Sequence, residues 1–407
     1  MPEGLCTEGH NHVQGGQEMS TTRRSMSGNY AIAYAVKMAD VDVIAAYPIT
    51  PQTTIVEKLS EYVANGELDA DYINVESEHS AMSACVGASL TGARVFTATA
   101  SQGLAFMHEV LFMASALRTP MVMANVNRAL SAPLNIWNDH SDAMAERDSG
   151  WIQLWASSAQ DALDLTIMAF KIGESERLPV MVNLDGFILS HTYEPIDLPD
   201  TEKVRKYIPS RPLTNRLSPK TAFSIGVVGP PEYYYEMKYQ AVDAIEKSRS
   251  KIKDVYAEYE KTFGRRYKDI ETYGIEDAEI VLVTMGAMTG SARIVSEEMK
   301  AAGIKAGVIS IRTFRPFPSE ELLDLASGLK GIGIMDRATT PGGPSNPLFA
   351  DVASCLYSSS RVPLQGFVAG LGGRDITLDD FRMMFRETDR ASKEGRGRSP
   401  IYVGLRE

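Results

Sequence analysis

Four short segments of the chain carry the side chains best suited to catalysis or to binding a small charged ligand. Each follows an apolar stretch typical of a buried strand, and together they offer carboxylates, several hydroxyl groups and a guanidinium. Sites in open parallel sheets form beyond the carboxyl ends of the strands, so we expect the segments to meet in one crevice. They are residues 48–53, 76–79, 99–103 and 125–128.

The charged side chains in these segments have more than one interpretation. Arg128, together with a hydroxyl group, suits a small carboxylate ligand, which a guanidinium binds through paired hydrogen bonds. The alternative is that Arg128 only ties its loop to a nearby acid such as Asp139. A glutamate at the start of a helix, Glu76 or Glu78, fits either a catalytic role or a stabilising contact with the helix dipole. Residue types alone leave these alternatives open.

Motifs for several other kinds of chemistry are missing from the sequence. It contains no Walker motif, no HExxH and no GxSxG, and the turn at residues 286–290 lacks the GxGxxG spacing of a dinucleotide site. The three cysteines are far apart, which argues against disulfides and against an iron–sulfur cluster. Near the N-terminus, Cys6, His10 and His12 would leave a metal site incomplete. We therefore expect no metal to be held by this chain.

The composition is that of an acidic globular protein. The 407 residues are 44% hydrophobic and 23% charged, with a formal net charge of -11. Such a charge argues against a nucleic-acid interface, which needs a basic face. The longest apolar region, residues 95–126, is interrupted by charged side chains and predicts a buried core instead of a membrane span. Since the N-terminus also lacks an apolar signal, we expect a cytoplasmic protein without nucleic-acid or membrane partners.

Short apolar segments alternate with helical periodicity along most of the chain, which predicts an α/β fold with two parallel-sheet domains. Between the two runs, a charged segment with apolar residues at helical spacing predicts an exposed amphipathic helix. We expect a flexible leader (1–26), a first domain (27–210), a connector with the amphipathic helix (211–275), a second domain (276–391) and a C-terminal tail (392–407).

Seven longer motifs carry a resemblance to a known family. They are AAYPITPQT (45–53), VESEHSAMSACVGA (75–88), TATASQGLAFMHEVLF (97–112), NRALSAPLNIWNDHSD (127–142), RDSGWIQLWA (147–156), GFILSHTYEPIDLPD (186–200) and FVAGLGGRDIT (367–377). With these motifs the sequence resembles the alpha subunit of multi-subunit 2-oxoacid:ferredoxin oxidoreductases, the pyruvate synthase group. The resemblance covers nearly all of residues 27–407.

The resemblance implies a thiamine-diphosphate enzyme whose active site is divided between chains. This chain would combine a pyrimidine-type thiamine-diphosphate domain with a transketolase C-terminal-like domain. A beta subunit would carry the diphosphate and Mg²⁺ motif, and iron–sulfur clusters would lie in partner chains that include gamma and ferredoxin-like delta subunits. The implied reaction converts pyruvate and coenzyme A to acetyl-CoA and CO₂, or the reverse, with ferredoxin or another electron acceptor. The chain would be active only with its partners.

The resemblance also implies roles for individual residues. Glu78 matches the catalytic carboxylate that contacts the aminopyrimidine ring of the cofactor, whereas Glu76 has a structural role. Thr50 and Arg128 match the positions that hold the substrate carboxylate. The neighbours of Thr50, Ile49 and Pro51, belong to the cofactor-binding loop.

A loop with Trp137, Asn138 and His140 lies where the family varies and is a candidate specificity loop. The acid could therefore be larger than pyruvate, and an aromatic or branched 2-oxoacid such as phenylglyoxylate is the alternative substrate for the same chemistry. An alternative of another class is a non-catalytic scaffold subunit of a redox complex.

Overall fold

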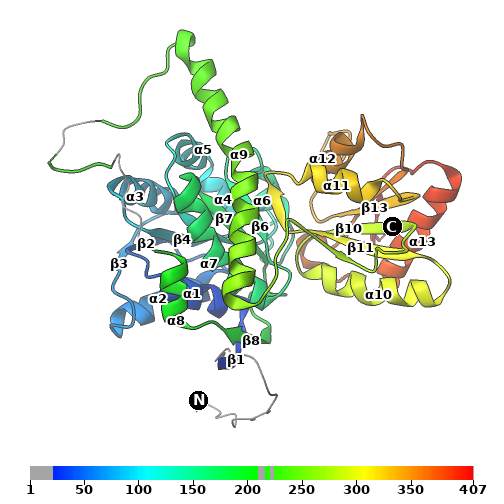
Figure 1. The fold of residues 1–407 in the computed structure, drawn as a ribbon, viewed down its shortest axis with the longest axis horizontal. Coiled ribbons are helices and arrows are strands. Elements are labelled where there is room, and N and C mark those ends of the chain that lie inside the picture. Colours follow the sequence, from blue (N-terminus) through cyan, green and yellow to red (C-terminus); the bar gives the residue numbers. More distant parts are fainter. Residues whose placement is uncertain (1–21, 210–215, 221–223, 407) are drawn as a thin grey trace.

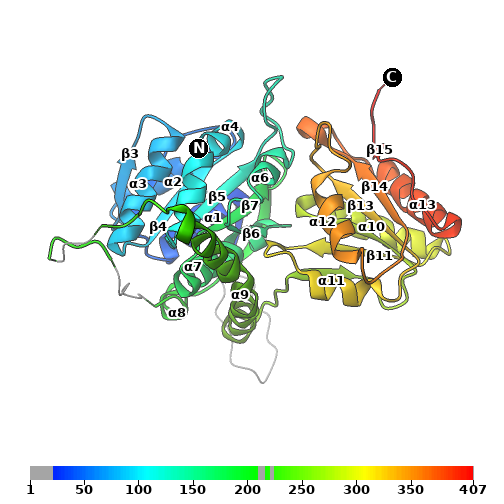
Figure 2. The same ribbon diagram turned by 90° about the horizontal axis from the view of Figure 1, so that it is seen from above.

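The computed structural model of the chain describes residues 22–209, 216–220 and 224–406, and it confirms the α/β class expected from the sequence (Figure 1). Two large sheets lie side by side, and helices pack on both faces of each (Figure 2). Within the described chain, no helix is long and apolar enough to cross a membrane. Cys6, His10 and His12, weighed above as metal ligands, lie outside the described residues.

The first sheet has seven strands in the order β12-β6-β7-β5-β4-β2-β3, and every neighbouring pair is parallel except β12 with β6. Its central strands are buried at every residue, as expected where helices cover both faces. The strands are β2 (Val43–Ala46), β3 (Asp71–Asn74), β4 (Val95–Thr99), β5 (Val122–Asn127), β6 (Ile152–Trp155), β7 (Val180–Asp185) and β12 (Thr313–Arg315).

Two groups of helices enclose the first sheet. One face packs against α1 (Gly28–Met38), α2 (Thr53–Ala64), α7 (Ala159–Glu176) and α8 (Thr201–Tyr207). The opposite face packs against α3 (Glu78–Thr91), α4 (Ser101–Phe106), α5 (His108–Ala116) and α6 (Ser141–Ala145).

The second sheet has the order β15-β14-β13-β10-β11-β9 and is parallel except for the edge strand β9. Helices α10 and α13 cover one face, and α11 and α12 cover the other. The elements are β9 (Ile270–Tyr273), β10 (Ile280–Thr284), η1 (Gly286–Met288), α10 (Thr289–Ala301), β11 (Ala306–Ile311), α11 (Ser319–Ala326), β13 (Gly331–Asp336), α12 (Pro347–Leu356), β14 (Leu364–Val368), η2 (Leu371–Gly373), α13 (Leu378–Glu394) and β15 (Ile401–Tyr402).

Both ends of the described chain are more ordered than the sequence suggested. Residues 22–26, assigned above to a flexible leader, belong to β1 (Thr22–Ser27), which pairs antiparallel with β8 (Tyr193–Leu198). In the expected tail, β15 pairs parallel with β14 and so extends the second sheet. Each short strand is stabilised by a partner distant in sequence, so it leaves no local periodicity that a sequence analysis can detect.

The connector contains a long helix, α9 (Pro231–Phe263), which projects beyond the first sheet at its N-terminal end (Figure 1). Tyrosines at this end are exposed, but Tyr256, Tyr259 and Phe263 near the other end are buried in the core of the first domain. The expectation of an exposed amphipathic helix is therefore wrong for the C-terminal half of α9. Hydrophobic burial against α7, together with a hydrogen bond from Tyr259 to Asp164, holds that half in place.

The chain passes between the sheets beside Asp269, whose carbonyl accepts hydrogen bonds from the amides of Arg312 (2.9 Å) and Thr313 (3.1 Å). The Asp269 side chain is only 6% exposed, and its Oδ1 has no hydrogen-bond partner among the described residues. Burial raises the pKa of this carboxyl to about 6. The folded protein therefore binds this proton more tightly than the unfolded chain does, so ionisation of Asp269 costs the fold stability.

We predict that Asp269→Asn stabilises the protein in a pH-dependent way. The wild type loses stability as the pH rises from the unfolded pKa near ~4 through the folded value of about 6. The variant should therefore be roughly 2 kcal/mol more stable than the wild type at neutral pH and almost equal to it near pH ~4. Melting temperatures across this range test the prediction, with exposed Asp254→Asn as the control. A pH-independent difference would contradict it.

Candidate active site

The carboxyl ends of β2, β3, β4 and β5 lie together at one edge of the first sheet, because these parallel strands are neighbours. The four segments that the sequence singled out follow these strands. The structure therefore places the loops with Thr50, Glu78, Ser101 and Arg128 at the same edge, as the strand order requires.

Glu78 is the first residue of α3, directly after the N-cap Ser77, whose side chain accepts a hydrogen bond from the Ser80 amide. The Glu78 side chain is 8% exposed, and in the described chain no donor forms a hydrogen bond or ion pair with its carboxylate. It lies against Gly103, where an added Cβ would be 2.8 Å from Oε1 of Glu78. Glu78 is thus a nearly buried carboxylate with its hydrogen-bonding capacity unused.

Glu76 differs from Glu78 in both exposure and contacts. It is exposed to solvent and accepts a hydrogen bond from the Ser80 hydroxyl, which lowers the pKa of the Glu76 carboxyl. Its contact stays within the first turn of α3. Glu76 is thus an exposed carboxylate with a local contact, whereas Glu78 is the nearly buried one of the pair.

Arg128 lies at the end of β5 and is 6% exposed. Its Nε donates to the carbonyl of Asn135 (2.8 Å) and its Nη1 to the carbonyl of Thr50 (2.9 Å). Burial lowers the pKa of the guanidinium, and no carboxylate of the described residues forms an ion pair with it. Asp139, the alternative partner, binds Ser141 and the Gly372 amide instead. Arg128 is therefore a buried cation with donors left for an anion.

The loop with Thr50 is fixed by its backbone. Asn29 Nδ2 donates to the carbonyl of Pro51 (2.8 Å), and the Gln52 amide donates to the carbonyl of Ile49 (2.9 Å). Pro51 is buried, whereas the side chain of Thr50 is exposed at the site. Arg128 contacts the carbonyl of Thr50, and in the described chain the hydroxyl group of Thr50 forms no hydrogen bond.

Asp142 at the start of α6 is a residue that the sequence analysis did not identify. It is 1% exposed, and its Oδ2 accepts hydrogen bonds from the backbone amides of Ser101 and Arg128, both at 3.0 Å. Its Oδ1 accepts from Asn127 Nδ2 at 3.0 Å. Burial raises the pKa of the Asp142 carboxyl. One side chain thus ties two of the site loops together, a role that no local sequence signal reveals.

Asp185 at the end of β7 connects the first domain to the second. Its Oδ1 accepts hydrogen bonds from Asn138 Nδ2 (2.5 Å) and Arg337 Nη1 (2.5 Å) and lies 3.0 Å from His140 Nε2. Its Oδ2 accepts from the amide of Ala287 (2.6 Å). Burial alone would raise the pKa of Asp185, but Arg337 and His140 hold it well below its usual range.

This contact changes the interpretation of the candidate specificity loop. Asn138 and His140 are buried, and both side chains bind Asp185, so they serve the contact between domains in this structure. Trp137 is 53% exposed and is the member of the set that can face a ligand or a partner.

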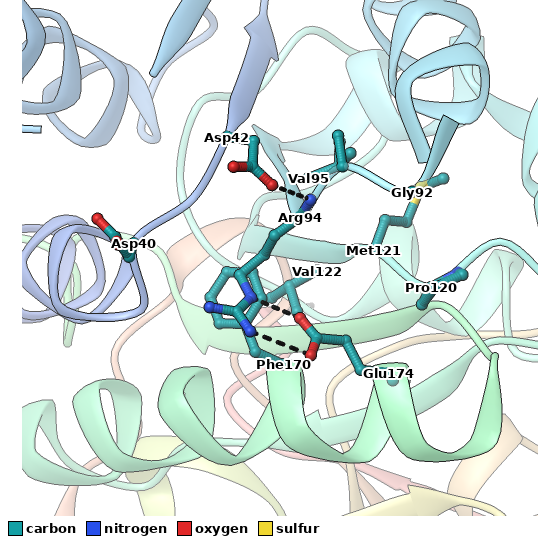
Figure 3. Close-up of a pocket in the computed structure, with 12 residues that line it drawn as sticks. Asp40, Asp42, Gly92, Arg94, Val95, Pro120, Met121, Val122, Phe170 and Glu174 are labelled. Carbon is teal, nitrogen blue, oxygen red and sulfur yellow. Dashed lines mark hydrogen bonds and ion pairs between the residues drawn. The ribbon is translucent and has the colours of Figure 1, made fainter. Parts of the chain in front are cut away.

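A cavity of about 170 Å³ lies away from these loops, at the N-terminal ends of β4 and β5 (Figure 3). Arg94 and Glu174 form a two-pronged ion pair in it, and the Arg94 amide donates to Asp42 (2.6 Å). The one guanidinium of the cavity is thus already paired, and the cavity lies at the opposite ends of the strands from the site loops. Elsewhere in the described chain, no group of three His, Cys, Asp or Glu side chains could hold a metal ion.

Both halves of the chain match models of related oxidoreductase domains. Residues 34–257 match the family described as "Pyruvate flavodoxin/ferredoxin oxidoreductase, thiamine diP-bdg", and residues 278–381 match "Pyruvate:ferredoxin oxidoreductase core domain II". The pyruvate synthase subunit PorA of Methanocaldococcus jannaschii is 49% identical over 94% of this chain and 98% of its own length. The ketoisovalerate oxidoreductase subunit VorA of Pyrococcus abyssi is 44% identical over 93% of this chain and 96% of its own length.

Solved structures show the same fold at lower sequence similarity. The 2-oxoglutarate:ferredoxin oxidoreductase from Magnetococcus marinus has a TM-score of 0.71 at 18% identity, over 93% of this chain and 67% of that chain. A split-gene transketolase has a TM-score of 0.56 at 12% identity. Both comparisons support the arrangement of two α/β domains.

We predict that Asp142→Asn destabilises the protein, because the NH2 group of asparagine cannot accept a hydrogen bond. Oδ2 of Asp142 accepts from the amides of Ser101 and Arg128, and Oδ1 accepts from Asn127 and Ala143, so in either orientation of the asparagine one pair of donors is left without an acceptor. Losing two charge-assisted hydrogen bonds corresponds to about 3–6 kcal/mol at most, so the melting temperature should fall by several degrees. The control is Asp148→Asn, which changes an exposed aspartate a few residues away. Equal melting temperatures for the two variants would contradict the role of Asp142.

Proposed function

The chain belongs to the pyruvate flavodoxin/ferredoxin oxidoreductase family, and we propose that it is the alpha subunit of a complex that oxidatively decarboxylates pyruvate. The products would be acetyl-CoA and CO₂, or the reaction would run in reverse as a synthase. The observation that carries the proposal is that Glu78 and Arg128, on loops at the same edge of the first sheet, are both buried and both lack a charged partner among the described residues. Unpaired buried charges are costly, so they indicate a ligand.

Glu78 fits the aminopyrimidine end of thiamine diphosphate. Its carboxylate can accept a hydrogen bond from a ring nitrogen. Gly103 lets the Glu78 side chain lie directly against α4, because a Cβ at Gly103 would clash with it. When bound, the cofactor supplies the electron sink for the charge that develops as CO₂ leaves. Glu78 would exchange a proton with the ring nitrogen. Because Glu78 is nearly buried, water would not compete for that proton.

Arg128 fits the carboxylate of the 2-oxoacid. A guanidinium has five N–H donors, and the carbonyls of Asn135 and Thr50 use two of them. The others can bind a carboxylate, and the exposed hydroxyl of Thr50 can add a neutral hydrogen bond. These contacts would hold the carboxylate before it leaves as CO₂.

We propose that partner subunits supply the rest of the active site. The relatives PorA and VorA are named as subunits, which supports a complex of several chains. A beta subunit would bind the diphosphate through Mg²⁺, because Mg²⁺ usually bridges phosphate to protein oxygens. Gamma and delta subunits with iron–sulfur clusters would pass the electrons to ferredoxin. Family membership argues against the alternative of a non-catalytic scaffold.

A second substrate is favoured by one specific observation. VorA, a ketoisovalerate oxidoreductase subunit, is almost as similar to this chain as PorA is. A branched 2-oxoacid is therefore the main alternative to pyruvate, ahead of aromatic acids. Rates of the purified complex with pyruvate and 2-oxoisovalerate as competing substrates decide between them, and a preference for the branched acid would overturn the assignment of pyruvate.

We predict that Glu78→Gln lowers kcat/KM of the purified complex by about 10²–10⁴-fold, because an amide cannot exchange the proton at the ring nitrogen. Assembly with the partners and the melting temperature should stay close to those of the wild type. The matched control is Glu76→Gln, two residues away and exposed. A normal rate for Glu78→Gln would overturn the assignment of Glu78.

We predict that Arg128→Lys raises KM for pyruvate by roughly 10–100-fold and lowers kcat less, because a charged hydrogen bond to the substrate is lost. Thr50→Val should have a smaller effect, since it keeps the carbonyl that binds Arg128 and removes only the hydroxyl. Steady-state kinetics and melting temperatures of both variants test this. A loss of activity that only follows a loss of stability would assign Arg128 a structural role.

A further inference from the structure

We propose that the glycine turn η2 of the second domain and Asn135 of the first act as positioning residues for Arg128. The affinity for the 2-oxoacid would then be set by a contact between the two domains. This inference rests on the proposed function, because it requires that Arg128 binds the substrate carboxylate.

The first step is the contact between Arg128 and Asn135. Nε of Arg128 donates to the Asn135 carbonyl at 2.8 Å, and Nη1 donates to the Thr50 carbonyl at 2.9 Å. A guanidinium is planar, so two acceptors on different atoms fix the orientation of its plane. The two carbonyls therefore also fix the direction of the remaining N–H groups of Arg128. A displacement of the Asn135 carbonyl would turn the guanidinium and misalign a bound carboxylate.

The second step concerns the loop that carries Asn135. Its tip is open to solvent, with Leu134 77% and Trp137 53% exposed. Within the loop, the amide of Trp137 donates to Asn135 Oδ1 (2.7 Å), and the amide of Ala129 donates to the Trp137 carbonyl (3.0 Å). These internal contacts close the loop but do not attach Asn135 to the sheet. The position of Asn135 therefore depends on what the loop packs against.

The third step is that η2 of the second domain contacts this loop at several points. Asn135 Nδ2 donates to the carbonyl of Gly372 (3.1 Å), and the amide of Gly373 donates to the carbonyl of Asn138 (2.7 Å). The Gly372 amide also donates to Asp139 Oδ2 (3.1 Å). Asp185 of the first domain holds the loop at Asn138 and His140, and the turn of the second domain adds the contact at Asn135 itself.

The turn needs glycine for two reasons. Gly372 and Gly373 have φ values of +57° and +78°, which residues with a side chain rarely adopt. In addition, a Cβ on Gly373 would lie 2.3 Å from Cβ of Trp137, closer than two carbon atoms can approach. A side chain at Gly373 would therefore push the loop away and carry the Asn135 carbonyl with it.

The test is the kinetics of the purified complex with its partner subunits, using pyruvate as the substrate. Asn135→Ala removes both hydrogen bonds of the side chain, the one to the Gly372 carbonyl and the one from the Trp137 amide, and keeps the Asn135 carbonyl. We expect it to raise KM about tenfold, because the loop that carries this carbonyl is displaced, with kcat within about twofold of the wild type. Gly373→Ala should shift KM in the same direction.

Gly373→Ala could act through backbone strain or through displacement of the loop, and a second glycine variant separates the two effects. Gly395 has a similar φ of +71°, but an added Cβ there would meet no atom within 4 Å. Gly395→Ala therefore introduces the same strain without touching the loop, and it should leave KM unchanged. Equal increases in KM for Gly373→Ala and Gly395→Ala would overturn the proposal.

A double-mutant cycle tests whether Asn135 acts through Arg128. If it does, Asn135→Ala should raise KM no further in a complex that already carries Arg128→Lys, because coupled residues are not additive. Independent, multiplicative effects would overturn the inference and leave the role of Arg128 intact. An unchanged KM in Arg128→Lys alone would instead overturn the proposed function, and this inference with it.

Discussion

The buried carboxylate of Asp185 is the contact on which the arrangement of the site depends. It has no exposed surface, and it binds Asn138 and His140 from the site loop, Ala287 from η1 and Arg337 from the end of β13. Burying an ion pair costs desolvation energy that is recovered only when the remaining hydrogen bonds are satisfied. Four donors around one carboxylate meet this requirement. The second domain is therefore held against the first at Asp185.

The position of the Arg128 guanidinium depends on this contact. With the loop fixed at Asn138 and His140, and with Asp142 binding the amide of Arg128, the guanidinium stays buried without a counter-ion of its own. Glu78 is also nearly buried without a counter-ion, because it lies in the first turn of α3 and against Gly103. The protein thus holds a cation and an anion that are both available to a ligand. Preorganised groups of this kind stabilise charge without reorganising during the reaction.

The sequence predicts the loops of the site, but it does not predict the contacts that join residues far apart in the chain. Parallel strands and their order bring the loops with Glu78 and Arg128 to one edge, and the motifs of the family identify both residues. The contact between Asp185 and Arg337 joins positions 152 residues apart, so no local pattern reports it. The same is true of β12, which comes from the second half of the chain and completes the first sheet. Asp142 lies inside a recognised motif, but its function becomes visible only when β4 and β5 are side by side.

A chain that contributes only the pyrimidine end of the site should not hold the cofactor alone. Titration calorimetry of thiamine diphosphate with Mg²⁺, into the purified chain and into the complete complex, measures this directly. We expect saturable binding to the complex and, for the chain alone, binding weaker than about 1 mM, equivalent to about −4 kcal/mol. Tight, Mg²⁺-dependent binding to the chain alone would contradict an active site divided between subunits.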